Sequence, residues 1–136
     1  VQASTEYRFF IIIGPVGSYF AGGINPLRLR VEENFVRSAP GGTGFAKTGG
    51  NYSASLLPIA QAQAAGYDNI IWLDALTKGY IEEMGAMNIA FVYEDRIITA
   101  PAGDTILDGV TRDSVSQLCK DFGFNVFVLV YVPGQY

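Results

Sequence analysis

A glycine-rich stretch from Gly41 to Tyr52 is the sequence feature that most constrains how this chain can fold. Five of its twelve residues are glycine, and a single lysine, Lys47, lies near its middle. Glycines let the backbone turn sharply and come close to a ligand, so we expect a loop here. A lysine in such a loop can hold a phosphate as a cation, or attack a carbonyl as a neutral amine and form a Schiff base. It can also lie free in solvent, as most lysines do.

The residue types missing from the sequence exclude several kinds of catalytic site. The chain has no histidine, which excludes Ser-His-Asp and Cys-His catalysis and the common zinc sites. Any acid–base chemistry must therefore come from Lys, Asp, Glu or Tyr, or from a bound cofactor. Cys119 is the only cysteine, so it forms no internal disulfide, which fits a reducing compartment.

Length, charge and hydropathy limit the size of the fold and the partners of the chain. With 136 residues it is long enough for one domain with a core and too short for two ordinary ones. The formal net charge of -4 argues against nucleic acid as the main partner, because phosphate contacts need a basic face. The longest apolar runs, 9–13 and 126–132, have the length of strands, so we expect no membrane span.

The order of strand and helix patterns predicts a mixed α/β domain. Helical spacing predicts helices over 51–65 and 111–122, each followed by a glycine. Pro58 falls inside the first of these and should kink it or mark its first turn. Neighbouring hairpin strands break the strand–helix alternation of a doubly wound fold, so we expect a mixed sheet. Apolar or alternating runs predict strands, the first of them buried, over residues 7–13, 27–31, 70–73, 80–83, 88–93, 96–99 and 125–132.

The nucleotide-binding P-loop is one interpretation of the glycine-rich stretch. Its pattern is Gly, four residues, Gly, Lys, then Ser or Thr, followed by a helix. Gly41, Lys47 and Thr48 fit, but Ala46 replaces the glycine that lets backbone amides wrap a phosphate. No clear strand precedes the stretch either, so the pattern disfavours a P-loop.

Two further stretches favour a lysine that meets a carbonyl ligand. Residues 106–112 end a loop and open a helix, where free N–H groups and the helix dipole make an anion site; an ordinary helix capped by Thr111 is the alternative. Glu82 and Glu83 are neighbours on a predicted strand, so their side chains point to opposite faces. A carboxylate that points inward needs a partner, and a pyridinium nitrogen is a suitable one; a surface acidic pair is the alternative. A lysine, a phosphate-binding helix start and an inward carboxylate are together what pyridoxal phosphate requires.

These motifs resemble those of the branched-chain amino acid aminotransferases, which are fold-type IV pyridoxal-phosphate enzymes. The resemblance runs from about Phe9 to about Phe124, and it rests on Gly41–Gly44 with Ala46–Tyr52, on Glu83–Ile89, and on Leu107 with Gly109–Arg112. It implies an α/β, mixed-sheet, barrel-like cofactor domain. It also implies pyridoxal-phosphate-dependent transamination of Leu, Ile and Val with 2-oxoglutarate as the acceptor.

The resemblance assigns catalytic and ring-binding roles to three residues. Lys47 matches the lysine that forms the Schiff base with pyridoxal phosphate, a role that needs a neutral amine and that partial burial would favour. Tyr52 matches the tyrosine that hydrogen-bonds the phenolic oxygen of the cofactor. Glu83 matches the carboxylate on the pyridine nitrogen.

Other residues match the phosphate and substrate sides of the family's site. Val110 and Thr111 correspond to the backbone and side-chain contacts of the cofactor phosphate. Ala86 and Met87 fall in the segment on the substrate side of the ring. Asp108 stands where the family usually has proline, and a carboxylate close to a phosphate is repulsive unless it points away.

The resemblance also sets expectations for domains, assembly and location. Residues 1–136 would correspond to the large cofactor-binding domain of the family, without its small N-terminal domain and its last strands. The family consists of homodimers, and we expect a cytoplasmic protein, or a mitochondrial one in a eukaryote, whose partners are branched-chain amino acids and 2-oxo acids. One alternative is a truncated or redesigned domain that binds pyridoxal phosphate without turnover. Another is a different fold-type IV activity, such as D-amino acid transamination or an aminodeoxychorismate lyase, although the motif over 83–88 favours the branched-chain group.

Overall fold

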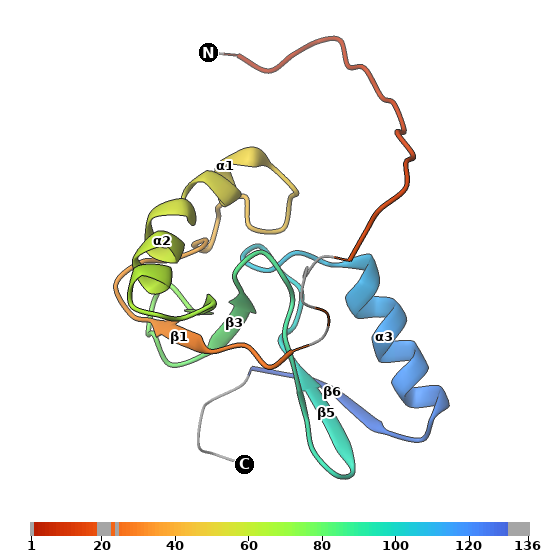
Figure 1. Ribbon diagram of the computed structural model, residues 1–136. Helices are drawn as coiled ribbons and strands as arrows, with labels where there is room; N and C mark the ends of the chain where they lie inside the picture. The colour runs from red at the N-terminus through yellow and green to blue at the C-terminus, as the bar shows by residue number, and fades with distance from the viewer. Residues whose placement is uncertain (1, 19–22, 24, 131–136) are drawn as a thin grey trace.

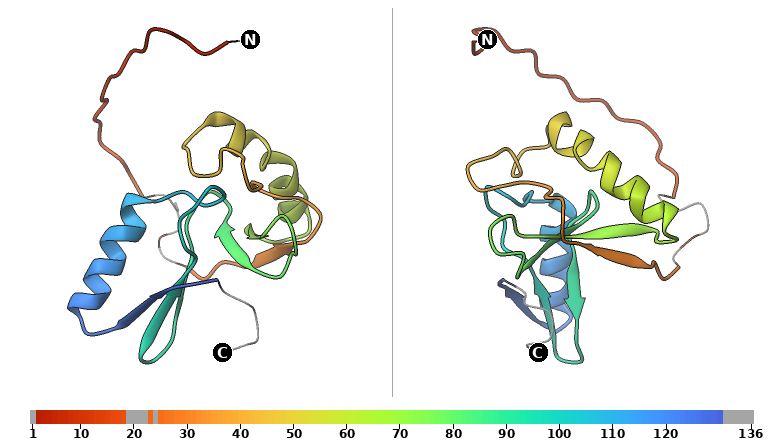
Figure 2. Two further views of the ribbon diagram at one scale, coloured as in Figure 1. Left: turned by 180° about the vertical axis from the view of Figure 1, so that it is seen from behind. Right: turned by 90° about the vertical axis from the view of Figure 1, so that its left-hand side faces the viewer.

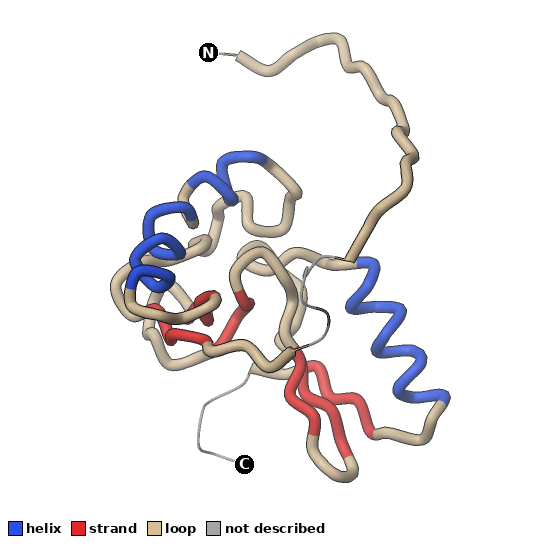
Figure 3. Tube along the Cα trace, viewed as in Figure 1, coloured by secondary structure: helices blue, strands red, loops and turns tan. Residues whose placement is uncertain are grey.

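The computed structural model contains two three-stranded sheets with helices beside them (Figures 1 and 2). It describes residues 2–18, 23 and 25–130. In Figure 3 the strands of the two sheets lie in separate parts of the molecule, with loops between them. Among the described residues, no helix is both long and apolar enough to cross a bilayer.

The first sheet has the strand order β1-β2-β3 and holds one parallel and one antiparallel pair. β1 (Leu29–Glu32) lies parallel to β2 (Asn69–Leu73), and β2 lies antiparallel to β3 (Ile81–Met84). The parallel pair is joined by the glycine-rich stretch and two short helices, α1 (Gly49–Ser53) and α2 (Leu56–Ala64). Parallel neighbours need such a crossover, whereas β2 and β3 need only a hairpin.

The second sheet repeats this combination in the opposite order. β4 (Ala90–Val92) and β5 (Arg96–Thr99) form an antiparallel hairpin. The chain then crosses over through α3 (Val110–Asp121) to β6 (Asn125–Val128), which lies parallel to β5. The mixed α/β class predicted from the sequence therefore describes both sheets. The last predicted strand ends earlier than expected, and its predicted residues 131 and 132 lie outside the described part of the chain.

The buried core is centred on Trp72 of β2. Trp72, Ile70 and Ala62 of α2 are each 0% exposed, and Phe35 and Ile59 pack against them. The indole Nε1 of Trp72 donates a hydrogen bond of 2.8 Å to the carbonyl oxygen of Gly85, which satisfies its one polar atom. This core holds α2 against the first sheet and fixes the end of β3, where the motif beginning at Glu83 starts.

The predicted buried strand over residues 7–13 is wrong for this structure. Residues 7–13 have no strand conformation, and Phe9 and Ile13 are 88% and 93% exposed. In the views of Figures 1 and 2 this segment runs away from the rest of the molecule as extended chain. A strand needs a neighbour to pair with, and no described strand pairs with this one.

The predicted helix over residues 51–65 is split into two. α1 ends at Ser53 and α2 begins at Leu56, so Pro58 falls in the first turn of α2, where its missing N–H costs no helical hydrogen bond. Of the two outcomes predicted for Pro58, a kink or a first turn, the second is found. Ala54 and Ser55 separate the two helices.

Candidate active site

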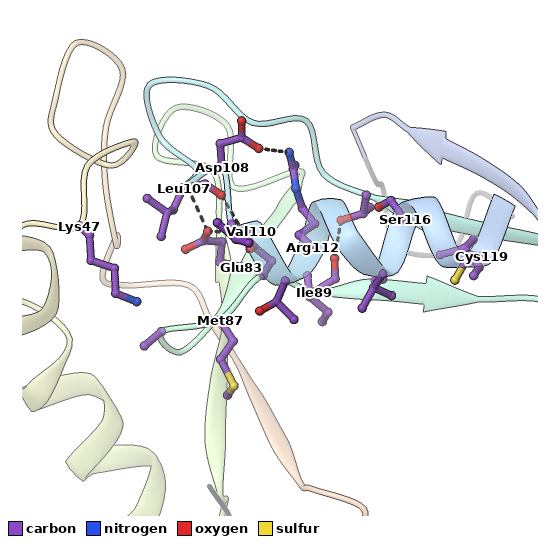
Figure 4. Close-up of a pocket in the computed structure, with 18 residues that line it drawn as sticks. Lys47, Glu83, Met87, Ile89, Leu107, Asp108, Val110, Arg112, Ser116 and Cys119 are labelled. Atoms are coloured by element: carbon purple, nitrogen blue, oxygen red, sulfur yellow. Dashed lines mark hydrogen bonds and ion pairs between the residues drawn. The ribbon is translucent and has the colours of Figure 1, made fainter. Parts of the chain in front are cut away.

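A pocket of about 750 Å³ opens between the lysine loop, the segment after β3, the hairpin of the second sheet and the start of α3 (Figure 4). Segments that are far apart in the sequence therefore meet around one space. Six of the seven predicted site residues line it: Lys47, Glu83, Ala86, Met87, Val110 and Thr111. The pocket also has lining residues without a predicted role, and these include Asn88, Thr99, Arg112, Ser116 and Cys119.

Lys47 reaches into the pocket from the glycine-rich loop, and Tyr52 lies behind it. The Lys47 amine lies 5.4 Å from the centroid of the Tyr52 ring. The Tyr52 hydroxyl oxygen is buried and has no hydrogen-bond partner among the described residues. A buried hydroxyl without a hydrogen-bond partner is unfavourable, so a ligand atom that donates to it or accepts from it would stabilise this position. Lys47 itself is exposed, so the expected partial burial is not found.

The loop that carries Lys47 is held in shape by Asn51 of α1. The buried Asn51 amide donates hydrogen bonds to the carbonyl oxygens of Thr43 (2.7 Å) and Ala46 (2.8 Å), and its oxygen accepts one from the Thr43 hydroxyl (2.9 Å). These bonds satisfy backbone groups that a glycine-rich loop would otherwise leave to water. The position of Lys47 is therefore set by the start of the helix that follows it.

Glu83 is 1% exposed and is tied to three other groups. Arg37 Nε lies 2.5 Å from its Oε2, while the Asn88 amide (2.9 Å) and the Leu107 N–H (3.2 Å) donate to its Oε1. Burial raises the pKa of Glu83, and the Arg37 guanidinium and the Leu107 N–H oppose that rise. An ionised carboxylate accepts about four hydrogen bonds. The three donors therefore leave Glu83 able to accept one more from a group in the pocket.

The start of α3 forms the opposite end of the pocket. The first hydrogen bond within the helix comes from the Asp113 N–H to Gly109, so the N–H groups of Val110 and Thr111 have no partner inside the helix. Asp108, whose carboxylate would repel a nearby anion unless it points away, is bound by Arg112 at 2.7 Å (Figure 4). This ion pair offsets the negative charge, so the start of α3 keeps the character of an anion site.

Arg37 and Asn88 are important in the site but received no role from the sequence. Arg37 lies in a segment whose pattern is ambiguous, and its buried side chain contacts two distant residues, Glu83 and Thr105, of which Thr105 is 68 residues along the chain. Asn88 belongs to the motif after β3. It links the Glu83 carboxylate (2.9 Å) to the Leu107 carbonyl (2.9 Å) and so connects the end of β3 to the segment before α3. Its place in the motif was the one signal that could have identified it.

Comparison with protein families and with curated sequences gives consistent results. The family model for amino-transferase class IV matches residues 6–129. The chain is 48% identical over 130 residues to a branched-chain-amino-acid aminotransferase of Mycolicibacterium smegmatis, and 46% identical over 127 residues to branched-chain-amino-acid transaminase 1 of Bacillus subtilis. Each alignment covers 93% of this chain, but only 35% and 36% of the relative. The chain thus spans about a third of the length of these relatives.

Solved structures of such enzymes share the fold of this chain. A T.th. branched-chain amino acid aminotransferase, complexed with N-(5'-phosphopyridoxyl)-L-glutamate, superposes with a TM-score of 0.70 and 35% identity over 80% of this chain and 36% of its own. The enzyme of Thermoproteus uzoniensis, solved with norvaline, gives a TM-score of 0.75 and 28% identity over 88% of this chain and 39% of its own. The predicted fold class and the resemblance to branched-chain aminotransferases are both confirmed.

Proposed function

The chain belongs to the amino-transferase class IV family, and on that premise we propose that it binds pyridoxal 5'-phosphate, with Lys47 as the lysine that forms the Schiff base. The observation that carries this proposal is the pocket in which Lys47, Glu83 and the start of α3 meet. The free hydroxyl of Tyr52 beside Lys47 supports it further, because the phenolic oxygen of the cofactor would give that hydroxyl a partner. The residues present therefore fit the cofactor.

Each end of the pocket suits one part of pyridoxal phosphate. Glu83 has acceptor capacity left for the ring nitrogen, and Arg37 favours the ionised form of Glu83 that such a contact needs. The free N–H groups of Val110 and Thr111 and the Thr111 hydroxyl suit the phosphate. Ala86 and Met87 line the same pocket beside Lys47 and are the proposed substrate side.

We propose that the reaction is transamination of the branched-chain amino acids Leu, Ile and Val, with 2-oxoglutarate as the acceptor. When bound, pyridoxal phosphate supplies a carbonyl that takes up the amino group and a ring that accepts the electron pair left at the substrate α-carbon. Lys47 would be the base in this scheme. Its amine can accept the proton from the substrate α-carbon and hold it for return to the carbon of the cofactor that carries the amino group. The glutamate adduct in the solved T.th. structure supports a glutamate and 2-oxoglutarate pair.

Binding of pyridoxal phosphate without turnover is the second candidate. It is favoured by the exposure of Lys47, because catalysis needs an amine and a substrate held in place and shielded from water. A homodimer and a reducing, cytoplasmic location remain further proposals. The free Cys119 supports the second of these.

An absorbance titration tests the cofactor site and separates the two candidates. Pyridoxal phosphate is added to the whole chain and its visible absorbance is recorded, first alone and then with leucine and 2-oxoglutarate. We expect a new band from linkage to lysine, and we expect Lys47→Ala to abolish it while Lys120→Ala, which removes an exposed lysine at the end of α3, leaves it unchanged.

The response to substrate then decides the activity. A band that leucine removes and 2-oxoglutarate restores supports transamination, whereas a band that leucine leaves unchanged supports binding alone. If Lys120→Ala weakens the band as much as Lys47→Ala does, or if no band forms, the assignment of Lys47 is wrong.

A further inference from the structure

The two neighbouring glutamates of β3 face two different pockets. Glu83 lines the large pocket described above, and Glu82 lines a second pocket of about 250 Å³. No residue lines both pockets, as expected when successive strand side chains point to opposite faces. The second pocket is therefore separate from the first, and the proposed cofactor site does not use it.

The carboxylate of Glu82 is buried with one oxygen unpaired. Its side chain is 8% exposed, and the Thr105 hydroxyl donates a hydrogen bond of 2.7 Å to Oε1. Oε2 is buried and receives no hydrogen bond within the described part of the chain. A buried carboxylate oxygen that lacks a hydrogen-bond donor is unfavourable. A donor from outside the described residues would therefore stabilise it. Burial accordingly raises the pKa of Glu82, and the nearby charges of Asp74 and Asp104 raise it further.

The other carboxylates of this pocket already have partners. Asp74 accepts hydrogen bonds from the N–H groups of four residues of its own hairpin and from the Thr77 hydroxyl. Asp104 accepts a hydrogen bond of 2.9 Å from the Gly41 N–H. Arg37, whose charge lowers the pKa of Glu82, is already bound to Glu83, and no lysine or arginine lines the pocket. The carboxylates of the pocket thus make it negative, and Glu82 Oε2 is the carboxylate oxygen that lacks a partner among the described residues.

The walls of the pocket indicate what kind of cation fits. They are largely apolar, with Ile81, Pro101, Ile106 and Val130 among the residues around Glu82. A metal ion would need several ligands, and the described residues contain no cluster of three or more His, Cys, Asp or Glu side chains suited to one. A guanidinium prefers both oxygens of a carboxylate, whereas Oε1 here is engaged by Thr105. A compact ammonium on an apolar stem matches one free oxygen and apolar walls.

We propose that this second pocket binds an alkylammonium group, with Glu82 Oε2 as its acceptor and the apolar walls around its stem. The group can come from a free amine or from a lysine side chain of another polypeptide. Both sources present the same ammonium group to Glu82. They differ because a lysine side chain is attached to a polypeptide backbone, which must fit at the opening of the pocket.

Nuclear magnetic resonance of the whole chain with n-butylammonium as the probe tests the proposal. We expect saturable shifts of the amide signals of Thr105 and Ile106 at millimolar probe, and a lower pKa of the Glu82 carboxyl when the probe is bound. Uncharged n-butanol should bind at least tenfold more weakly, and n-butylguanidinium more weakly than n-butylammonium. Glu82→Gln keeps the size of the side chain and an acceptor for Thr105. It should lower the affinity for n-butylammonium at least tenfold.

Matched controls make the outcome decisive. Glu33→Gln changes an exposed glutamate outside the pocket and should leave binding unchanged. Equal affinity for n-butanol, or an unchanged affinity in Glu82→Gln, overturns the proposal. A second titration with Nα-acetyl-lysine methylamide distinguishes the sources: binding supports a lysine side chain, and its exclusion while n-butylammonium binds supports a free amine.

Discussion

The two crossover connections of this protein have the same topology but differ in what their helices bury. In the first, α2 lies against β2, and Ala62 and Trp72 are 0% exposed. In the second, α3 joins β5 to β6 without burying any of its residues, and Leu118 and Val115 are 53% and 47% exposed. One crossover is filled by protein side chains, and the other borders a pocket of about 750 Å³.

The difference shows how one topological unit can provide either stability or a site. Small side chains such as Ala62 let α2 approach the sheet closely, so the large Trp72 can fill the space between them. On α3, Ser116 and Cys119 line a cavity that none of the described residues fills. A ligand placed there would complete the packing of the second crossover, which ties the stability of that half to occupancy of the site.

The largest predicted effect tests whether the first crossover carries the stability. Trp72→Ala should lower the free energy of unfolding by about 3–5 kcal/mol, because it removes the central buried side chain and leaves a cavity. The matched Leu118→Ala on α3 should cost only about 0.5 kcal/mol, since half of Leu118 is already exposed. Urea unfolding of both variants measures the two values. Equal losses would show that the two crossovers are packed alike.

The second prediction concerns Arg37, which links the two halves. It contacts the Thr105 carbonyl at 2.8 Å and is paired with Glu83, so Arg37→Leu would leave a buried carboxylate without its cation. We expect a loss of about 3 kcal/mol in unfolding free energy, and a smaller loss for Arg37→Lys, which keeps a charge. Arg28→Leu removes an exposed arginine and should cost less than about 1 kcal/mol. If Arg37→Leu matches Arg28→Leu in urea unfolding, the buried ion pair is not a structural link.

The third prediction uses pH to separate the hairpin of the first sheet from the glutamates of β3. Burial alone would raise the pKa of Asp74, but hydrogen bonds from Thr77, Tyr80 and Gly79 outweigh it and lower the pKa to about 2. A lowered pKa stabilises the fold above the ordinary value of 3.8, and this stabilisation is lost as pH falls toward 2. Glu82 and Glu83 have raised pKa values, so their contribution to stability falls as pH rises above 4.5.

Two substitutions separate these opposite contributions. Asp74→Ala should cost about 1–2 kcal/mol at neutral pH, a figure reduced for partial exposure, and should flatten the loss of stability between pH 3.8 and 2. Glu82→Gln should instead reduce the decline above pH 4.5. Unfolding midpoints measured across this pH range test both predictions. If Asp74→Ala loses stability below pH 3.8 as the unsubstituted chain does, the loss does not come from Asp74 of the hairpin.

Local patterns in the sequence predicted the second half of the molecule better than the first. The hairpin 90–99 and the helix α3 follow from alternation and from a glycine stop, both of which involve near neighbours. The motifs around Lys47, Glu83 and Thr111 predicted that these residues belong to one site, and the pocket that they share is consistent with that.

What the sequence could not predict depends on distant contacts. Residues 7–13 have the composition of a strand, but no strand in the described residues pairs with them. The burial of Arg37 results from contacts with Thr105 and Glu83, and no local pattern encodes them. The free oxygen of Glu82 likewise depends on which donors fold back toward it, so only the structure distinguishes it from Glu83.

The last predicted change in stability, at Gly109, tests the proposed anion-binding end of the second crossover. A side chain at Gly109 would clash with Asn88 Oδ1, and Asn88 cannot move freely because it is bound to Glu83 and Leu107. Gly109→Ala should therefore cost about 1 kcal/mol of stability by overpacking. The same substitution should lower the affinity for pyridoxal phosphate at least tenfold, because it shifts the start of α3. Gly103→Ala is the matched control, since a side chain there meets open space. Absorbance titration measures the cofactor affinity of both variants. Equal affinities would show that the start of α3 does not bind the phosphate, and the pocket would then lack its proposed anion site.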